Sequence, residues 1–359
     1  MLSVVLNDLG EQKISEWRTM KNYKLSFCIP EYNNPDAAYK LVTQLLTNKD
    51  DRFQVVVMDD ASTDDTFERL QTIKDGRLKL CRNQTNLGAK PTWCRALEHG
   101  DGEWLYLVMG RDRLNADNIG KLIDMLDDCL KKNVGCAADR KTTGRMRIFS
   151  LYDSVKYFLT FGEHPTGAIF RRTAFHSIRN RRRYFQLAFA YPEIYIKRDI
   201  LCSGYTGAVV NANVYTGEVN IDKAKVVSCF EKNKNVLYWY PQRHTEQFLH
   251  VLKMTEYDHR FDFSQPEYDA LFLNSWKNLM NKVSYNWRKH NADKVWTAHY
   301  GKECRTVGKQ EMLCNILSAY KTINRFYREQ DWNMSFQRHA QMLYSMIKTA
   351  VQIIVNKSI

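Results

Sequence analysis

LSFCIPEYN at residues 25–33, QVVVMDDAS at 54–62 and WLYLVMGRD at 104–112 share one pattern, an apolar run that ends in polar or acidic residues. Each run has the composition of a buried strand. The polar residues that follow these strands should therefore line one edge of a sheet. In open α/β sheets the carboxyl edge binds ligands, and a cluster of carboxylates there suits a nucleotide and its divalent metal.

Helical segments separate these runs. Apolar residues recur at helical spacing in residues 36–46, 67–73 and 117–130, and Ser62-Thr63-Asp64-Asp65 provides N-cap chemistry for the second helix. Another strand is expected at 77–81 and another helix at 91–98. Strands that alternate with helices imply right-handed crossovers, so we expect an α/β fold with a mostly parallel sheet.

The second half of the sequence is less regular. Short strands are expected at 168–170 and 206–210, with a basic helix or loop at 171–183 between them. From about residue 233 the sequence is typical of helices, and residues 336–355 carry an apolar stripe at helical spacing. We expect two domains, residues 1–225 with the sheet and residues 226–359 as a helical region for packing, oligomer or membrane contact.

Composition and charge favour a globular protein with an anionic partner. The chain has 359 residues, of which 44% are hydrophobic and 26% charged, and its formal net charge is +13. Such a charge favours nucleic acid, a phosphate-bearing substrate or an acidic lipid surface, although a basic protein without such a partner is an alternative. No nucleic-acid-binding motif accompanies the charge, so we do not expect nucleic acid as a partner.

The cysteines and the N-terminal sequence bear on location. Nine cysteines are scattered without a CxxC pair, so we expect reduced thiols and no zinc site. Residues 1–23 lack the apolar core of a signal peptide, and no stretch approaches the roughly 20 apolar residues that span a bilayer. The expected location is the cytoplasm, either free or at the inner face of the cell membrane.

Four motifs, in this order, resemble family 2 glycosyltransferases of the GT-A fold, which include bacterial O-antigen and capsule sugar transferases. IPEYN at 29–33 is similar to the family's Pro-x-Tyr-Asn, and VMDDASTD at 57–64 to its Val-Asp-Asp-Gly-Ser-x-Asp. Asn86-Leu87-Gly88 and residues 96–107 complete the set. The resemblance is strong from residue 25 to about 126 and weak to residue 210. It implies a GT-A, Rossmann-like sheet with flanking helices.

The resemblance also implies an activity. The chain would be an inverting glycosyltransferase that moves a sugar from a nucleotide-diphosphate donor, UDP- or dTDP-linked, in surface polysaccharide synthesis. The acceptor would be a glycan or a polyprenyl-diphosphate-linked glycan. Residues of the nucleotide-sugar site would be Pro30, Tyr32, Asp59, Asp60, Asn86, Gly88 and Arg111.

Each of these positions suits its implied role. Pro30 and Tyr32 would hold the base, and Asp59 would accept a hydrogen bond from the imide N–H of uracil or thymine. A simple turn with an N-cap is the alternative interpretation of the Asp59 segment. Asn86 and Gly88 would lie beneath the ribose and the diphosphate, Gly88 because a side chain would crowd the ligand.

Gly110-Arg111-Asp112 departs from the family, which usually presents Asp-x-Asp or a similar cluster at this point. Asp112 falls on the position that binds Mg²⁺ or Mn²⁺, but Gly110 and Arg111 replace the other carboxylates. One carboxylate with diphosphate oxygens and water can hold a hard cation. Alternatively, Arg111 pairs with phosphate and partly replaces the charge of the metal, or the site binds no metal.

The second catalytic residue besides Asp112 would be a base that takes a proton from the acceptor hydroxyl. In inverting members of the family an acidic pair precedes a Gly-Tyr strand. Glu193, before Gly204-Tyr205, falls on this motif, although Ile194 replaces the aspartate usually credited as the base. Nearby aromatic residues would raise the pKa of Glu193 by desolvation, which suits a general base. A carboxylate that complements a helix N-terminus is the alternative. Fallback bases are Asp199 and Glu163.

The expected partners are a nucleotide-sugar donor, a glycan or glycolipid acceptor, an anionic membrane surface and a second copy of the chain. Arg171–Arg183 would attract acidic head groups, and the 336–355 stripe would lie at the membrane interface. Packing within the protein is the usual fate of such a stripe. The main alternative function is a catalytically inactive GT-A relative that binds a partner, which Gly110 and Arg111 favour.

Overall fold

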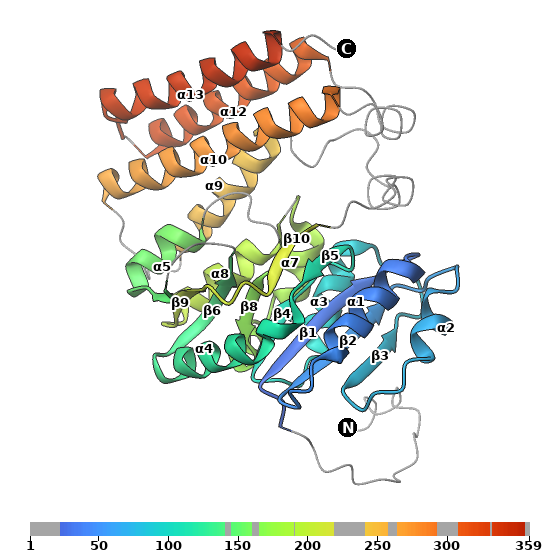
Figure 1. Cartoon of the computed structure of the whole chain (residues 1–359). Coiled ribbons are helices and arrows are strands. Elements are labelled where there is room, and N and C mark those ends of the chain that lie inside the picture. The colour runs from blue at the N-terminus through green and yellow to red at the C-terminus, as the bar shows by residue number, and fades with distance from the viewer. Residues whose placement is uncertain are drawn as a thin grey trace, which may run out of the picture.

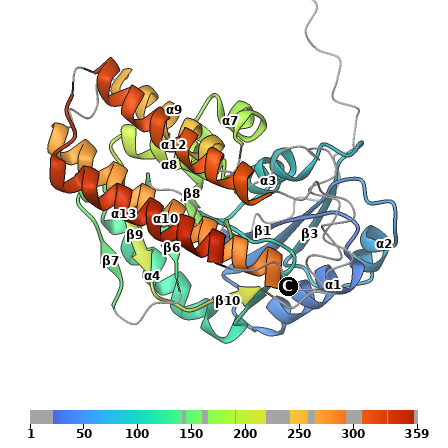
Figure 2. The ribbon, with the colours of Figure 1, turned by 90° about the horizontal axis from the view of Figure 1, so that it is seen from above.

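The computed structural model describes residues 22–140, 145–159, 165–189, 191–218, 241–257, 264–292, 308–330 and 332–355. Figure 1 shows an α/β part that contains the sheet, and a group of long C-terminal helices stacked on one side of it. Seen from above, the C-terminal helices lie over the part of the sheet that contains β6, β8 and β9 (Figure 2). The first and the last described residues thus belong to different layers.

The central sheet has eight strands in the order β3-β2-β1-β4-β8-β6-β9-β7. β1 is parallel to β2 and β4, β2 to β3, and β6 to β9, whereas β8 is antiparallel to β4 and β6 and β7 is an antiparallel edge strand. The predicted mostly parallel sheet is therefore confirmed. The strand bounds are β1 (Leu25–Glu31), β2 (Phe53–Asp59), β3 (Leu78–Arg82), β4 (Trp104–Leu107), β6 (Val134–Asp139), β7 (Arg147–Ile148), β8 (Ala168–Arg171) and β9 (Thr206–Val210).

Helices cover both faces of this sheet because its strands present apolar side chains to both sides. Phe27 and Ile29 belong to a core that includes residues of α1 and α4, while Cys28 belongs to a second core that includes residues of α3, α5, α7 and α8. Alternate residues of a strand point to opposite faces, so a strand covered on both faces is an unbroken apolar run. The helix bounds are α1 (Pro35–Thr47), α2 (Thr66–Gln71), α3 (Ala89–Glu98), α4 (Ile119–Lys131), α5 (Leu151–Phe158), α6 (Arg172–Ser177), α7 (Arg181–Leu187) and α8 (Glu193–Cys202).

The C-terminal region is helical, as the sequence predicts. α10 packs along α13, and α12 along α9, which in turn contacts α8 of the α/β part. The buried core of these helices is continuous with the core beneath α3 and α8, and includes Phe248, Trp276 and Ile353. The bounds are α9 (Pro241–Tyr257), α10 (Gln265–Ala292), α12 (Lys309–Glu329) and α13 (Phe336–Val355).

The domain boundary predicted near residue 225 lies outside the described residues. Before it, β10 (Tyr215–Glu218) pairs with β5 (Asp112–Leu114), so the α/β part extends at least to the end of β10. Within the described ranges no helix has the length and apolar content needed to cross a bilayer.

Candidate donor and acceptor sites

The loops after β1 and β2 are joined by hydrogen bonds at the carboxyl edge of the sheet. The Asp60 backbone N–H donates to the Glu31 carbonyl at 2.8 Å, and the Asn33 N–H donates to Ser62 Oγ at 2.9 Å. Asn33 Oδ1 in turn accepts from the Thr63 N–H at 2.8 Å. Pro30, near the end of β1, and Tyr32, in the loop that follows, are predicted to hold the base, and both are partly exposed.

Asp60 organises the next loop. Its Oδ1 accepts from Asn83 Nδ2 and from the Leu87 N–H, and its Oδ2 accepts from the Gly88 N–H, each at 2.8 Å. The carboxylate is buried. Asp60 therefore fixes the position of the Asn86-Leu87-Gly88 segment relative to the end of β2.

Asp59 ends β2 and lies beneath the loops that follow β1 and β2. Its side chain is fully buried, and its Oδ2 accepts from the Ser62 N–H and pairs with Arg82 Nε, both at 3.1 Å. Burial raises the pKa of this carboxyl, although the Ser62 hydrogen bonds and the Arg82 charge act in the opposite direction. Its predicted hydrogen bond to a base stays a prediction, and in this conformation the carboxylate is enclosed by protein.

Gly88 is the N-cap residue of α3, and its backbone conformation explains why it is glycine. It has φ +86°, a left-handed conformation, whereas an added Cβ would meet no atom within 4 Å. Conformation rather than crowding by protein therefore favours glycine here, and crowding by a ligand stays a prediction. The neighbouring Asn86 accepts from the Gly88 N–H with its side chain at 3.1 Å.

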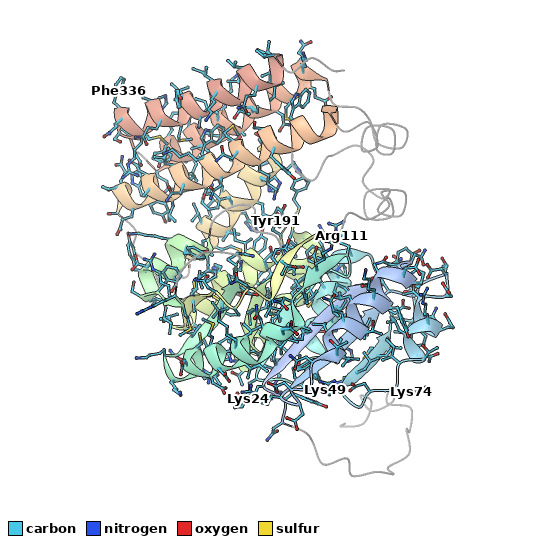
Figure 3. The ribbon with its side chains drawn as sticks, in the orientation of Figure 1. Lys24, Lys49, Lys74, Arg111, Tyr191 and Phe336 are labelled. Carbon is cyan, nitrogen blue, oxygen red and sulfur yellow. The ribbon has the colours of Figure 1, made fainter. Side chains whose placement is uncertain are left out.

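The segment after β4 lies on the side of the α/β part that faces the C-terminal helices. Figure 3 shows Arg111 on this side, as it does Tyr191, while Lys24, Lys49 and Lys74 mark the opposite edge. Arg111 is partly exposed. Its predicted contact with phosphate stays a prediction that this position allows.

Asp112 starts β5 and is buried. Its carboxylate accepts a hydrogen bond from the Thr166 hydroxyl, whose oxygen accepts from the Met109 N–H at 2.8 Å. β10, the partner of β5, is held by Asp139, which accepts from the Val214 and Tyr215 N–H groups at 3.0 Å each. The protein thus fixes Asp112 firmly before any ligand binds.

Glu31, which the sequence analysis did not include among the candidate residues, lies buried beside them. It ends β1 and is 5% exposed, between Asp59 on one side and the β4 extension on the other. Its Oε2 accepts from Asn34 Nδ2 at 3.1 Å. Burial raises the pKa of Glu31 to about 8, the Asn34 hydrogen bond opposes this, and the charges of Asp59 and Asp112 add to the rise. The available signal was an acidic residue inside the first motif.

Glu193 begins α8 and is buried near a lysine from the C-terminal helices. Lys282 of α10 donates a hydrogen bond to the Tyr191 hydroxyl, and its ammonium lies 3.8 Å from the Tyr191 ring centroid. Burial lowers the pKa of Lys282 to about 7, and the charge of Glu193 acts against this decrease. No local pattern pointed to this lysine, because it belongs to a helix far away in the sequence.

The fallback bases lie elsewhere. Asp199 accepts from the Tyr184 hydroxyl at 2.9 Å and pairs with Arg198 at 2.5 Å, so this carboxylate is engaged within the protein. Glu163 lies outside the described residues. Glu193 therefore stays the predicted base.

Residues 26–179 match the sequence model of Glycosyl transferase family 2. This part of the chain is a family 2 glycosyltransferase domain. It contains every predicted nucleotide-sugar residue, from Pro30 to Arg111, and the predicted metal ligand Asp112, whereas Glu193 and Lys282 lie beyond it. The predicted family and fold are thus confirmed, and the residue roles stay predictions.

Curated relatives of the family 2 domain are bacterial. The chain is 27% identical over 103 residues to the UDP-Glc:alpha-D-GlcNAc-diphosphoundecaprenol beta-1,3-glucosyltransferase WfaP of Escherichia coli. The aligned region covers 29% of this chain and 41% of WfaP. The chain is 27% identical over 111 residues to the putative teichuronic acid biosynthesis glycosyltransferase TuaG of Bacillus subtilis, covering 30% of this chain and 44% of TuaG. The chain thus spans less than half the length of these relatives.

A solved structure covers more of the chain at lower identity. The mannosyltransferase PcManGT from Pyrobaculum calidifontis, in complex with GDP-Man and Mn²⁺, is 14% identical, with a TM-score of 0.47 over 94% of this chain and 89% of that one.

The Asp112 carboxylate has the chemistry to contribute to a divalent-cation site in the family 2 domain. Asp112 is a buried carboxylate already oriented by Thr166, and oxygen ligands of this kind suit Mg²⁺ and Mn²⁺. Among the residues that the structure describes, no group of three or more His, Cys, Asp and Glu side chains is arranged to hold a metal. A cation would therefore depend on few protein ligands together with diphosphate and water.

Proposed function

We propose that this chain is an inverting glycosyltransferase that takes a sugar from a UDP- or dTDP-linked donor and transfers it to a glycan or a polyprenyl-diphosphate-linked glycan. Surface polysaccharide synthesis is the proposed setting, which the similarity to WfaP and TuaG supports. The observation that carries the proposal is the edge of the family 2 domain where the ends of β1, β2 and β4 come together. There Tyr32, Asp60 and Asp112 follow neighbouring strands.

The donor side would work by holding the diphosphate. Asp60 keeps the loop of Asn86 and Gly88 in place for the nucleotide, and Pro30 and Tyr32 contact the base. Asp112 would hold a divalent cation, which supplies positive charge to the leaving diphosphate when it is bound. Arg111 would add a second positive charge at the phosphates.

The acceptor side would work by removing a proton. The acceptor hydroxyl oxygen forms a bond to the anomeric carbon while the bond from that carbon to the diphosphate oxygen breaks, which inverts the configuration. Glu193 accepts the hydroxyl proton as general base. Lys282 donates a hydrogen bond to Tyr191 and interacts electrostatically with Glu193, so the C-terminal helices would complete the acceptor side of the site.

Release of nucleotide from a panel of donors tests the proposal. The full chain is incubated with UDP-, dTDP- and GDP-linked sugars and Mn²⁺, with and without an acceptor extract, and the free nucleotide is measured. Asp112→Asn should reduce the rate at least about a hundredfold, because it removes an electrostatic contribution to the transition state. Asp101→Asn is the matched control, since Asp101 precedes β4 at its other end and pairs with Lys79. No release from any donor would contradict the proposal.

The alternative is a catalytically inactive relative that binds a partner. Gly110 and Arg111, where acidic residues are usual, are the observations that favour it. The alternative predicts that nucleotide binding, if present, occurs without turnover and that Asp112→Asn leaves it unchanged. A basic nucleic-acid-binding protein is less well supported, because only the net charge favours it.

The predicted membrane and oligomer contacts stay predictions. α13 presents Phe336, Tyr344, Ile347 and Val355 with more than half of each side chain exposed. In the basic run, Arg181 and Arg182 both pair with Glu98 at 2.9 Å, which reduces the charge left for a lipid surface. The cytoplasmic location is proposed on the same basis as the donor, since nucleotide sugars would be the substrates.

A further inference from the structure

Glu31 and Gly110 form a matched pair across neighbouring strands. An ideal Cβ placed on Gly110 would lie 1.4 Å from Glu31 Oε1, 2.2 Å from its Cδ and 2.6 Å from its Oε2. All three of the nearest atoms therefore belong to the Glu31 carboxylate. The glycine at position 110 leaves the space that this carboxylate fills.

The register of the sheet explains why these two residues meet. β1 and β4 pair in parallel with Leu25 opposite Trp104 and Cys28 opposite Leu107. The same offset continued by three residues places Glu31 opposite Gly110. On its other side Glu31 is paired with Asp59. Partners in register present their side chains on the same face of a sheet, so Glu31 reaches the place where a side chain of residue 110 would stand.

The Glu31 carboxylate has an acceptor oxygen that the protein does not use. Its Oε2 accepts from Asn34, whereas its Oε1 is buried and accepts no hydrogen bond from any residue in the described ranges. A buried acceptor without a donor is costly, and such groups in native proteins usually have a ligand or a function. The neighbouring negative charges of Asp59 and Asp112 increase this cost. A bound cation would relieve both effects.

We propose that Glu31 and Asp112 are both ligands of the divalent cation. Glu31 would supply from β1 the carboxylate that an acidic residue at position 110, after β4, usually provides in the family. The proposal rests on the proposed nucleotide-diphosphate donor, whose oxygens complete the coordination. Mg²⁺ or Mn²⁺ is the expected cation, because both ligands are carboxylates.

Manganese binding to the full chain tests this assignment without measuring sugar transfer. Free Mn²⁺ is followed by its electron paramagnetic resonance signal during titration of the protein, with and without UDP. Glu31→Gln keeps the size of the side chain and a hydrogen-bond acceptor but removes the charge. It should weaken Mn²⁺ binding in the presence of UDP by about tenfold or more, since even outer-shell partners contribute that much. Asp101→Asn should leave the affinity unchanged.

A relocation of the carboxylate makes the test specific. Glu31→Ala with Gly110→Asp moves the carboxylate from one strand to the other and should restore Mn²⁺ affinity to within about threefold of the wild type, provided that direct charge governs binding. Glu31→Ala with Gly110→Asn is the uncharged matched control and should stay weak. Far-ultraviolet circular dichroism checks that each variant is folded, and Glu31→Gln alone decides if the double variants fail to fold.

Two results would overturn the assignment. One is wild-type protein with UDP that fails to bind Mn²⁺ at millimolar concentration, and the other is Glu31→Gln that binds it as tightly as the wild type. The outcome is separate from that of the proposed function. Mn²⁺ bound through Glu31 without release of nucleotide would contradict the transferase alone, while donor turnover with unchanged Mn²⁺ affinity in Glu31→Gln would contradict the ligand assignment alone.

Discussion

Asp60→Asn provides a direct test of how the donor loop is held. The Asp60 carboxylate accepts from three donors, two of them the backbone N–H groups of Leu87 and Gly88. An asparagine has one acceptor oxygen, and its amide nitrogen would face at least one of those N–H groups. The change should therefore remove one charge-assisted hydrogen bond, which contributes about 1.5–3 kcal/mol.

The effect should be local and measurable by hydrogen exchange. A loss of about 2 kcal/mol of protection corresponds to roughly 30-fold faster amide exchange in peptides that contain residues 83–89. UDP affinity should fall in the same variant, because this loop is predicted to lie beneath the ribose. Asp65→Asn is the matched control, since Asp65 is exposed and makes no side-chain cap hydrogen bond to α2. If amide exchange in the 83–89 peptides is unchanged in Asp60→Asn, the Asp60 carboxylate does not hold this loop.

Three further predictions concern single positions. Gly110→Ala should lower the free energy of unfolding, measured in urea, by about 1–3 kcal/mol, because the added methyl group overpacks against Glu31. In a Glu31→Ala background the same change should lower it by much less. If the two effects are simply additive, Glu31 and residue 110 are not in contact. Gly88→Ala should lower the free energy of unfolding by about 1–3 kcal/mol, because alanine is strained at a φ of +86°. Gly76 is equally uncrowded but has no positive φ, so Gly76→Ala should lower the free energy of unfolding by less. Equal losses in the two variants would contradict backbone strain at Gly88. Burial lowers the pKa of Lys282 to about 7 from 10.5, so the unfolded chain binds more protons between these values and stability rises with pH. Relative to Lys282→Met, the wild type should gain about 2 kcal/mol from pH 7 to pH 9, and a flat difference would show that the ammonium is solvated.

The strands and helices of the α/β part were largely predictable because their signals are local. β1 and β2 are mostly apolar runs that end at Glu31 and Asp59, and α13 occupies the predicted 336–355. β5 has three residues and β7 two, and β5 pairs with β10, which is far away in the sequence. Segments this short carry too little periodicity to be predicted, since tertiary pairing alone defines them.

Candidate site residues could be predicted from the sequence where a residue occupies a position of a glycosyltransferase motif. Asp112 lies in such a place, and the structure holds it by a hydroxyl that no motif contains, Thr166. Glu31 was missed because its relation to Gly110 depends on the register between two strands rather than on sequence spacing. Lys282 was missed because a distant helix brings it to Glu193. Such juxtapositions arise from tertiary packing, which leaves no mark on the local pattern of either residue.

The most direct test of a donor site at the carboxyl edge of the sheet is a crystal structure. A crystal of the full chain is soaked with UDP and Mn²⁺, and diffraction is measured for the anomalous signal of manganese. We expect one anomalous peak within coordination distance of Asp112, with the diphosphate beside it at the carboxyl ends of β1, β2 and β4. Nucleotide bound at any other part of the molecule, or an edge that stays empty of both nucleotide and manganese at saturating concentrations, would contradict this expectation.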